Sequence, residues 1–412
     1  MDDSTSWPLR LRIAFRFCCC YLLLYSLPST GAVSIFQSFP SGEKIARPYV
    51  ALWHAINPWV AIHVFHLSGQ RVTYFPTGSG DTTLDYIQNL LYLLIAVAAT
   101  LIWSVLDRRR PHYRELYPWL RLLVRYTLAF TLFAYGFAKL FPLQFQPARL
   151  HRLVEPYGEF SPMGVLWNFM GASQAFTIFS GAAETLGGVL MLFRRTTTLG
   201  SMAAFAVLAN VVALNFCYDV PVKLYSTNLL LMSVFLMAPD FRRLLNVLVF
   251  NRPAAPAPDY AVRFERRWLR LSAAVFAVFF VGYQICGQLI SGWQFYHQVY
   301  VSPQRPPLYG LYDVESGAPS NWRKVIFEAP TSMAVRTAAD EVVTFPVKYA
   351  ASSLRVNGAD DYTWSAPDAS HLVLTGKWAG DPSTIRLRRI DPSQFLLHSR
   401  GFHWISEQPF NK

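Results

Sequence analysis

The stretch AFTIFSGAAETLGGVLMLF, residues 175–193, decides the class of fold, because it is an apolar run close to the length that a helix needs to cross a bilayer. Its one charged residue is Glu184, and Thr177, Gly181 and Gly188 share a helix face with it. Small residues on one face let a second helix approach closely. A carboxylate near the bilayer centre is costly unless it is protonated, paired or in contact with water. Two interpretations of Glu184 stay open: a functional group, and a buried group that only fixes helix packing.

Composition assigns the whole chain to the multi-pass membrane proteins. Of its 412 residues, 53% are hydrophobic and 15% are charged, whereas soluble proteins carry about 25% charged residues. Nearly all of the net charge of +12 lies in the first 302 residues, which hold 25 of the 37 Lys and Arg but only 14 of the 25 Asp and Glu. Basic residues beside apolar spans set the orientation in a membrane. No soluble region presents a basic face, so the lipid bilayer is the predicted partner and nucleic acid is not.

Seven membrane spans can be drawn, and the arginines between them predict the topology. The spans are Ile13–Val33, Leu84–Leu106, Leu122–Phe141, Ser173–Phe193, Thr198–Cys217, Val222–Ala238 and Trp268–Ile290. Arginines gather before the first span and in the loops after the second, fourth and sixth. All four groups fall on one side if the N-terminus is cytoplasmic. The sequence therefore predicts a protein of the bacterial cytoplasmic (inner) membrane with an extracytoplasmic C-terminal domain.

The expected fold is an α-helical membrane bundle followed by an all-β antiparallel barrel or sandwich. Its parts are a two-span region at 1–110 with an outer interfacial helix, a four-helix module at 119–240, a cytoplasmic linker at 251–267, a last span at 268–290 and a β domain at 303–412. In the β domain, about eight short runs of strand-forming residues alternate with turns such as NGADD and AGDPS. Arg400, His403 and Trp404 are interpreted as strand closure and core.

Polar residues of the four-helix module predict a pocket in the outer half of the membrane. Glu184 and Lys139 are its candidate catalytic residues, and its candidate lining is Arg125, Tyr135, Asn210 and Asn228. Lys139 lies about 12 Å above the middle of its span, so its side chain either bends toward Glu184 or extends to the interface. Buried asparagines also serve simply to bond neighbouring helices, an alternative that stays open for Asn210, Asn215 and Asn228.

The segment YDVPVK, residues 218–223, is predicted to be the hairpin between two spans. Pro221 suits a first helical turn, Asp219 favours the helix N-terminus, and Lys223 is placed to pair with Asp219. These two charges are the candidate mouth of the pocket, although a helix-end role alone explains them. The segment TGSGDTT, residues 77–83, lies directly before the second span and is expected to cap it through Asp81 or Thr82. No metal-ligand spacing is present, and the histidines near residues 54–66 fit an interfacial helix.

The segments RYTLAFTLFAYGFAKLF (125–141) and SGAAETLGGVLML (180–192) resemble the DoxX-like family of integral membrane proteins. The longer pattern is similar to larger bacterial proteins with extra helices and a C-terminal β domain. The resemblance implies a four-helix membrane module, and some family members are subunits of quinone-linked or thiol-linked oxidoreductase systems. The positions it carries over are Arg125, Gly136, Lys139, Glu184, Gly187 and Gly188.

Two functions from different classes follow from these patterns. The first is a component of a quinone- or thiol-linked membrane oxidoreductase, in which a quinone occupies the pocket and electrons come from a redox partner, because the chain has no evident redox centre. The alternative is a non-enzymatic envelope protein whose outer β domain binds a ligand or a protein. Transport is less favoured, because no broken helices recur in two halves of the chain. Whether the protein is itself an enzyme stays open.

Overall fold

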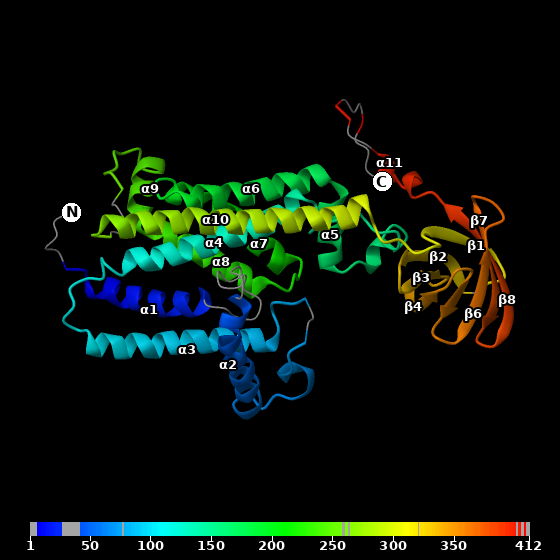
Figure 1. The fold of residues 1–412 in the computed structure, drawn as a ribbon, viewed down its shortest axis with the longest axis horizontal. Coiled ribbons are helices and arrows are strands. Elements are labelled where there is room, and N and C mark those ends of the chain that lie inside the picture. The colour runs from blue at the N-terminus through cyan, green and yellow to red at the C-terminus, as the bar shows by residue number, and fades with distance from the viewer. Residues whose placement is uncertain are drawn as a thin grey trace. The chain divides into compact units, whose positions relative to one another are not determined.

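The computed structural model describes residues 6–26, 42–75, 78–257, 260–262, 264–319, 321–400, 403–404 and 408. It divides into two compact units, which are drawn as ribbons in Figure 1. The first consists of Met1–Leu140 and Phe179–Gly292, and the second of Phe141–Ile178 and Trp293–Lys412. Each unit is therefore built from two separate stretches of chain.

The first unit is a bundle of helices, most of which run side by side (Figure 1). Its helices are α1 (Leu9–Ser26), α2 (Gly42–His63), α3 (Thr83–Leu106), α4 (Tyr117–Leu140), most of α6 (Gln174–Leu192), α7 (Thr197–Cys217), α8 (Lys223–Met237), α9 (Phe241–Leu248) and most of α10 (Arg267–Tyr296). Six helical segments in the described chain are long and apolar enough to cross a membrane; they are α3, α4, α6, α7, the run from α8 through α9, and α10 with the turn that follows it.

Burial identifies the middle of the bundle and the part that faces lipid. Two thirds of the apolar window of α4 is buried (67%), against 17% for α3 and 11% for α10. Large apolar side chains such as Val105 and Val278 are about three-quarters exposed, at 71% and 75%. Exposed apolar surface of this extent suits hydrocarbon and not water. The chain is a multi-pass membrane protein in which α4 is the central helix.

Helix α1 differs from the first predicted span, Ile13–Val33. It begins at Leu9, so Arg10, Arg12 and Arg16 lie within the helix and do not precede it, and the rest of the predicted span lies outside the described residues. The Arg16 guanidinium is buried (1% exposed) and donates to the Tyr113 hydroxyl at 2.7 Å, the Ser104 hydroxyl at 2.8 Å and the Asp107 carbonyl at 2.9 Å. Arg16 thereby fastens α1 to the end of α3, whereas the sequence had suggested only a loop charge.

The second unit contains a closed barrel of eight antiparallel strands, one of the two architectures, barrel or sandwich, that the sequence predicted. The strands are β1 (Gly310–Ser316), β2 (Trp322–Ala329), β3 (Ser332–Thr337), β4 (Val342–Tyr349), β5 (Ser353–Val356), β6 (Asp360–Ser365), β7 (His371–Trp378) and β8 (Asp381–Ile390). Each strand pairs with the next along the chain, and β8 pairs with β1 to close the barrel. Alternate residues point inward, and side chains such as Val325, Val335 and Leu387 fill the interior.

Two tight turns explain the register of the later hairpins. Asn357 and Gly358, between β5 and β6, have φ of 53° and 74°. Ala379 and Gly380, between β7 and β8, have φ of 50° and 95°. Positive φ at both central residues is the geometry whose twist matches that of paired strands. The turns predicted at NGADD and AGDPS are therefore confirmed.

The second unit also takes in the segment between α4 and α6, which the sequence had placed in the helical module. It includes the short helix α5 (Pro162–Ala172). Leu150 and Val154 pack on Leu311 and Ile326 of the barrel. The Glu328 carboxylate accepts from the Leu150 amide at 2.8 Å and meets His151 Nδ1 at 2.6 Å. One apolar contact and one polar clamp thus hold this segment on the barrel.

The predicted closing residues Arg400, His403 and Trp404 are not in a strand of the barrel, so that prediction was wrong. Strand β8 ends at Ile390 and is followed by the short helix α11 (Leu396–Ser399). Trp404 is 91% exposed, so it is not part of the barrel core. The barrel closes without this segment because β8 already pairs with β1.

Candidate functional site

A buried ion pair joins α4 to α6 in the helical unit. Lys139 Nζ lies 2.9 Å and 2.8 Å from the two carboxylate oxygens of Glu184. The two side chains are 6% and 4% exposed. Of the two orientations considered for Lys139, the structure has the one that bends toward Glu184. The two opposite charges attract each other, and this attraction offsets the desolvation cost that an isolated charge would have in a bilayer.

Glycines place the two helices close enough for this pair to form. A Cβ added at Gly181 would lie 2.6 Å from the Gly136 carbonyl oxygen and 2.7 Å from Lys139 Cβ. A Cβ added at Gly136 would overlap Thr185 Oγ1. The backbones of α4 and α6 therefore touch at these positions, as small residues on facing helices allow. The same close approach leaves no room for a ligand between the two glycines.

Two tyrosines stand next to the ion pair. Lys139 Nζ lies 5.6 Å from the centre of the Tyr135 ring, within reach of a cation–π interaction. The Tyr135 ring is 6.3 Å from that of Tyr225 on α8, and the Tyr225 hydroxyl is 3.3 Å from Thr131 Oγ1. The Lys139 side of the pair thus borders aromatic rings and hydroxyls. Tyr225 was not among the predicted site residues, although it precedes Asn228 by one helical turn.

Asn228 belongs to a separate polar cluster between α1, α3 and α8. Its Oδ1 accepts from the Tyr21 hydroxyl at 2.5 Å, and the same hydroxyl is 2.8 Å from Asn89 Oδ1. Asn228 Nδ2 donates to the Leu224 carbonyl. These contacts bond three helices together, which is the packing role that the sequence had left open for Asn228. Asn89 was not among the predicted site residues. A pattern in the second span could have indicated it, because Asp85, Asn89 and Tyr92 lie four and three residues apart and so share one helix face.

Asp219 and Lys223 are brought together at the start of α8. Lys223 Nζ is 2.7 Å from Asp219 Oδ1, as the four-residue spacing predicted. The helix end itself is capped by Asp81, whose carboxylate accepts from the Lys223 and Leu224 amides at 2.8 Å and 2.9 Å. The capping of α3 falls to Thr82, which forms a capping box with Asp85. Asp81 therefore joins the loop before α3 to the start of α8. The sequence gives no sign of this contact.

A cavity of about 280 Å³ opens beside this hairpin, lined by residues 70–71, 73–75 and 81–84. Asp81 is shared by the cavity and the α8 cap, with its side chain 8% exposed. The predicted mouth residue Lys223 lies 3.8 Å from the Asp81 carboxylate through its Nζ. Lys223 thus approaches the lining of this cavity through Asp81, whereas among the described residues Asp219 contacts only Lys223 there. The residues that line the cavity were not part of the predicted pocket or its mouth.

Arg125 and Asn210 lie apart from the Lys139–Glu184 pair. Arg125 precedes Lys139 by 14 positions of the continuous helix α4, which is about 21 Å of helix. Asn210 is exposed on α7 and does not point into the bundle. Asn215, by contrast, is buried and donates to the Ser226 hydroxyl at 2.9 Å, so it bonds α7 to α8. One pocket does not gather all four predicted lining residues, because the helices direct them to different levels and faces.

Metal ligands do not converge in the described residues, where no group of three His, Cys, Asp or Glu side chains is placed to hold an ion. The histidines considered at 54–66 take part in local contacts. His54 stacks on Tyr74 with ring centres 4.0 Å apart, and His63 Nδ1 is 2.9 Å from the Trp59 carbonyl oxygen. These histidines support helix α2 and the loop beside it.

Comparison with known proteins places the chain in a family without giving it an activity. No protein-family model matches the sequence, and no solved structure matches it. A segment of 132 residues, 30% of the chain, is 30% identical to a protein of Bacillus subtilis (strain 168) named Uncharacterized protein YwoB and covers 78% of that protein. The chain therefore belongs to the same family as YwoB. That name states no ligand or reaction, so the function must be argued from the residues.

Proposed function

We propose that the protein is the membrane component of a quinone-linked oxidoreductase system, with Lys139 and Glu184 as its proton-handling pair. The single observation that carries the proposal is the burial of this pair inside a membrane bundle. Ionisable groups within membrane spans are functional by default, because their burial is costly and apolar packing would serve structure as well. The resemblance of 125–141 and 180–192 to DoxX-like proteins adds the quinone as the carrier class.

The roles of the two residues follow from their chemistry. Reduction of a quinone takes up protons as well as electrons, and the electrons come from a reduced partner protein. In this proposal Lys139 donates a hydrogen bond to a quinone carbonyl oxygen, and Glu184 passes on one of the two protons that a two-electron reduction takes up. Solvent supplies the second proton. Tyr135 and Tyr225 offer ring faces against which a quinone ring can stack. The carrier must approach from this aromatic side, since Gly136 and Gly181 close the other.

A quinone can bind to Lys139 only if the ion pair with Glu184 is at least partly broken. Lys139 donates to both oxygens of Glu184, so it must leave at least one of them to reach a carrier. Protonation of Glu184 weakens the pair and frees Lys139, which couples carrier binding to proton uptake. The proposal further places the protein in the bacterial cytoplasmic membrane, with its N-terminus inside and the barrel outside.

The test is the identification of co-purified lipids by mass spectrometry. Wild-type protein, purified in mild detergent, is expected to retain a quinone, and Glu184→Gln to retain much less. Glu341→Gln, a change of the same kind at an exposed barrel position, is the matched control and should behave as wild type. Absence of quinone from the wild type, or equal retention by Glu184→Gln, would overturn the proposal.

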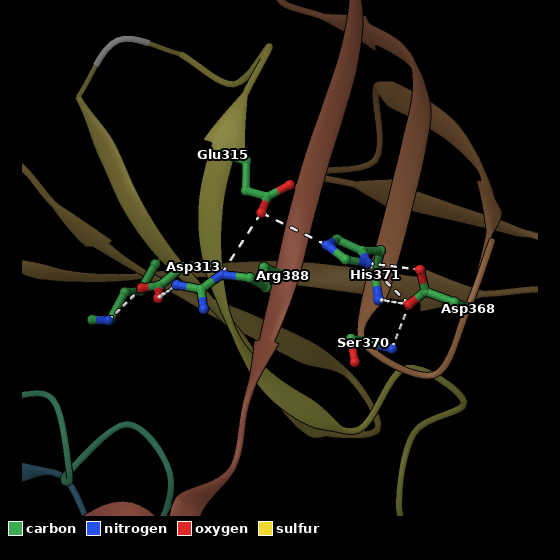
Figure 2. A network of polar contacts seen from close by, with 7 residues as sticks. Asp313, Glu315, Asp368, Ser370, His371 and Arg388 are labelled. Atoms are coloured by element: carbon green, nitrogen blue, oxygen red, sulfur yellow. Dashed lines mark hydrogen bonds and ion pairs between the residues drawn. The ribbon is translucent and has the colours of Figure 1, made fainter.

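A second candidate function is recognition of a partner by the barrel, and a surface network of charges favours it. On β1, β7 and β8, Asp313, Glu315, His371 and Arg388 lie side by side (Figure 2). Arg388 is 3.1 Å from Asp313, and His371 is 2.8 Å from Asp368. These side chains are 30–56% exposed, so they form an outward polar patch of both signs suited to orienting a partner. Capture of an envelope protein by the full-length protein, lost in Arg388→Glu and kept in Arg355→Glu, would favour this function.

A further inference from the structure

Two opposite charges line the cavity of about 280 Å³ without pairing with each other. Arg71 belongs to the short helical turn η1 (Gly69–Val72); its side chain is exposed and forms no ion pair or hydrogen bond within the described residues. Asp81 comes from a different segment of the lining, the loop before α3. The cavity therefore presents a cation and an anion from separate segments of the chain, which is complementary to a ligand that carries both charges.

The Asp81 carboxylate can still accept from a ligand, although it caps α8. Its two oxygens each accept from one neutral donor, the amides of Lys223 and Leu224, and a carboxylate offers about four lone-pair positions. Lys223 Nζ lies 3.8 Å from Asp81, beyond hydrogen-bond distance, and donates to Asp219 at 2.7 Å instead. An ammonium group in the cavity would therefore find free acceptor positions and an incompletely neutralised charge on Asp81.

The aromatic part of the lining is fixed by contacts with the neighbouring helices. The Tyr74 hydroxyl accepts from Asn57 Nδ2 at 2.7 Å, and the Tyr74 ring stacks on His54 with ring centres 4.0 Å apart. Asn57 is fully buried on α2, and its Nδ2 also donates to Gln88 of α3 at 2.9 Å. Tyr74 is thereby held against α2 and α3, so a ligand does not have to order this wall when it binds.

A stripe of exposed side chains on α3 begins at the cavity. Thr82 and Thr83 line the cavity, and Tyr86, Leu90 and Leu94 follow at spacings of three or four residues, so they share a helix face. These three side chains are 48%, 39% and 56% exposed. Helix α3 is apolar and long enough to cross a membrane, and tyrosine is enriched where hydrocarbon meets the lipid headgroups. The cavity therefore lies at headgroup level, and the stripe lies where acyl chains pack.

We propose that this cavity binds the headgroup of a phospholipid that carries a primary ammonium group, as phosphatidylethanolamine does. Arg71 donates to the phosphate, whose oxygens match the planar guanidinium, and Asp81 accepts from the ammonium group. A free zwitterion such as phosphoethanolamine would satisfy both charges but would not cover the stripe on α3. The cavity contains neither Lys139 nor Glu184, so lipid binding here and quinone retention at that pair can be measured independently.

Native mass spectrometry of the full-length protein in detergent tests the site. The protein is titrated separately with phosphatidylethanolamine, with phosphatidylcholine, whose quaternary ammonium has no N–H, and with phosphatidylglycerol, which has no ammonium. Wild type should bind phosphatidylethanolamine most tightly. Arg71→Gln should weaken that binding about ten-fold, the loss expected for one hydrogen bond between charged groups. The matched control is Arg47→Gln, which removes the same charge from an exposed position of α2 outside the cavity lining, and it should bind as wild type does.

Three results would overturn the proposal. Equal affinity of wild type for the three lipids is one, and equal losses in Arg71→Gln and Arg47→Gln are another, because both mean unspecific attraction. Displacement of the bound lipid by an equal concentration of phosphoethanolamine is the third, since it would identify a soluble zwitterion as the ligand. Asp81→Asn keeps an acceptor oxygen for the α8 cap but removes the charge, so it should abolish the preference for phosphatidylethanolamine over phosphatidylglycerol. This second variant decides the question even if Arg71→Gln folds poorly, because an unchanged preference would reject the role of Asp81.

Discussion

Replacement of Lys139 by methionine should strongly destabilise the helical unit. The change preserves the length of the side chain but leaves the Glu184 carboxylate buried without its partner, at 4% exposure. Because both members of the pair are almost fully buried, screening by solvent does not reduce the effect. Loss of one partner of a buried pair costs about 3–5 kcal/mol. The free energy of unfolding should fall by that order at neutral pH.

The pH dependence of this loss identifies its cause. In Lys139→Met a proton taken up by Glu184 removes the uncompensated charge, so the penalty should shrink as the pH falls. Removal of both charges, in Lys139→Met with Glu184→Leu, should return the stability to within about 1.5 kcal/mol of wild type, since apolar replacements of buried pairs are often neutral. The double variant should nevertheless retain no quinone if the proposed function holds.

The assay is reversible unfolding in mixed micelles, followed by circular dichroism, for wild type, both single variants and the double variant. The coupling energy comes from the double-mutant cycle. A single variant as stable as wild type, or a double variant that loses the sum of the two single losses, would refute the reasoning about the pair. A stable double variant that still retains quinone would leave the structural argument intact but reject the proposed proton relay.

Three further changes test other contacts. Gly181→Ala should cost about 1–3 kcal/mol, because its Cβ would meet the Gly136 carbonyl at 2.6 Å, while Gly282→Ala, which meets nothing within 4 Å, should be neutral; unfolding in micelles measures both. Asp81→Ala should cost about 1–2 kcal/mol and speed hydrogen exchange of the first amides of α8. At Glu328, burial alone would raise the pKa, but hydrogen bonds from His151 and the Leu150 amide outweigh it and hold the pKa below 4.5. Its stabilisation is therefore present above that pH and lost as the pH falls through the lowered pKa, so Glu328→Gln should flatten the acid side of the thermal stability profile of the barrel unit.

Each of these expectations has a contrary result. Equal stability of the two glycine variants would mean that α4 and α6 are not in backbone contact. Unchanged exchange at the start of α8 in Asp81→Ala would remove Asp81 as its cap. An acid profile of Glu328→Gln identical to that of wild type would show that the clamp between Glu328 and the 150–151 segment contributes nothing to the barrel unit.

The helices and strands were largely predictable because each carries a local signal. The apolar run at 175–193 and the Lys139 stripe at helical spacing place α6 and α4. The strands of the barrel follow from alternating residues and from turn pairs such as Asn357-Gly358. The clamp of Glu328 on the segment at 150–151 was not predictable, because its two parts are 178 positions apart and neither has a distinctive motif.

The candidate site, too, was predictable only where a local sequence signal exists. Sequence by itself determined that Glu184 and Lys139 sit in membrane spans and that Lys139 has two options, because composition and period fix the face and level of each side chain. Only the tertiary structure decided that Lys139 reaches Glu184, that Asn228 bonds to Tyr21, and that Arg125 and Asn210 face elsewhere. The physical reason is that small residues such as Gly181 show which face of a helix can be approached closely, but not which helix lies against it. That choice depends on three-dimensional packing, here the contact of Gly181 with Gly136.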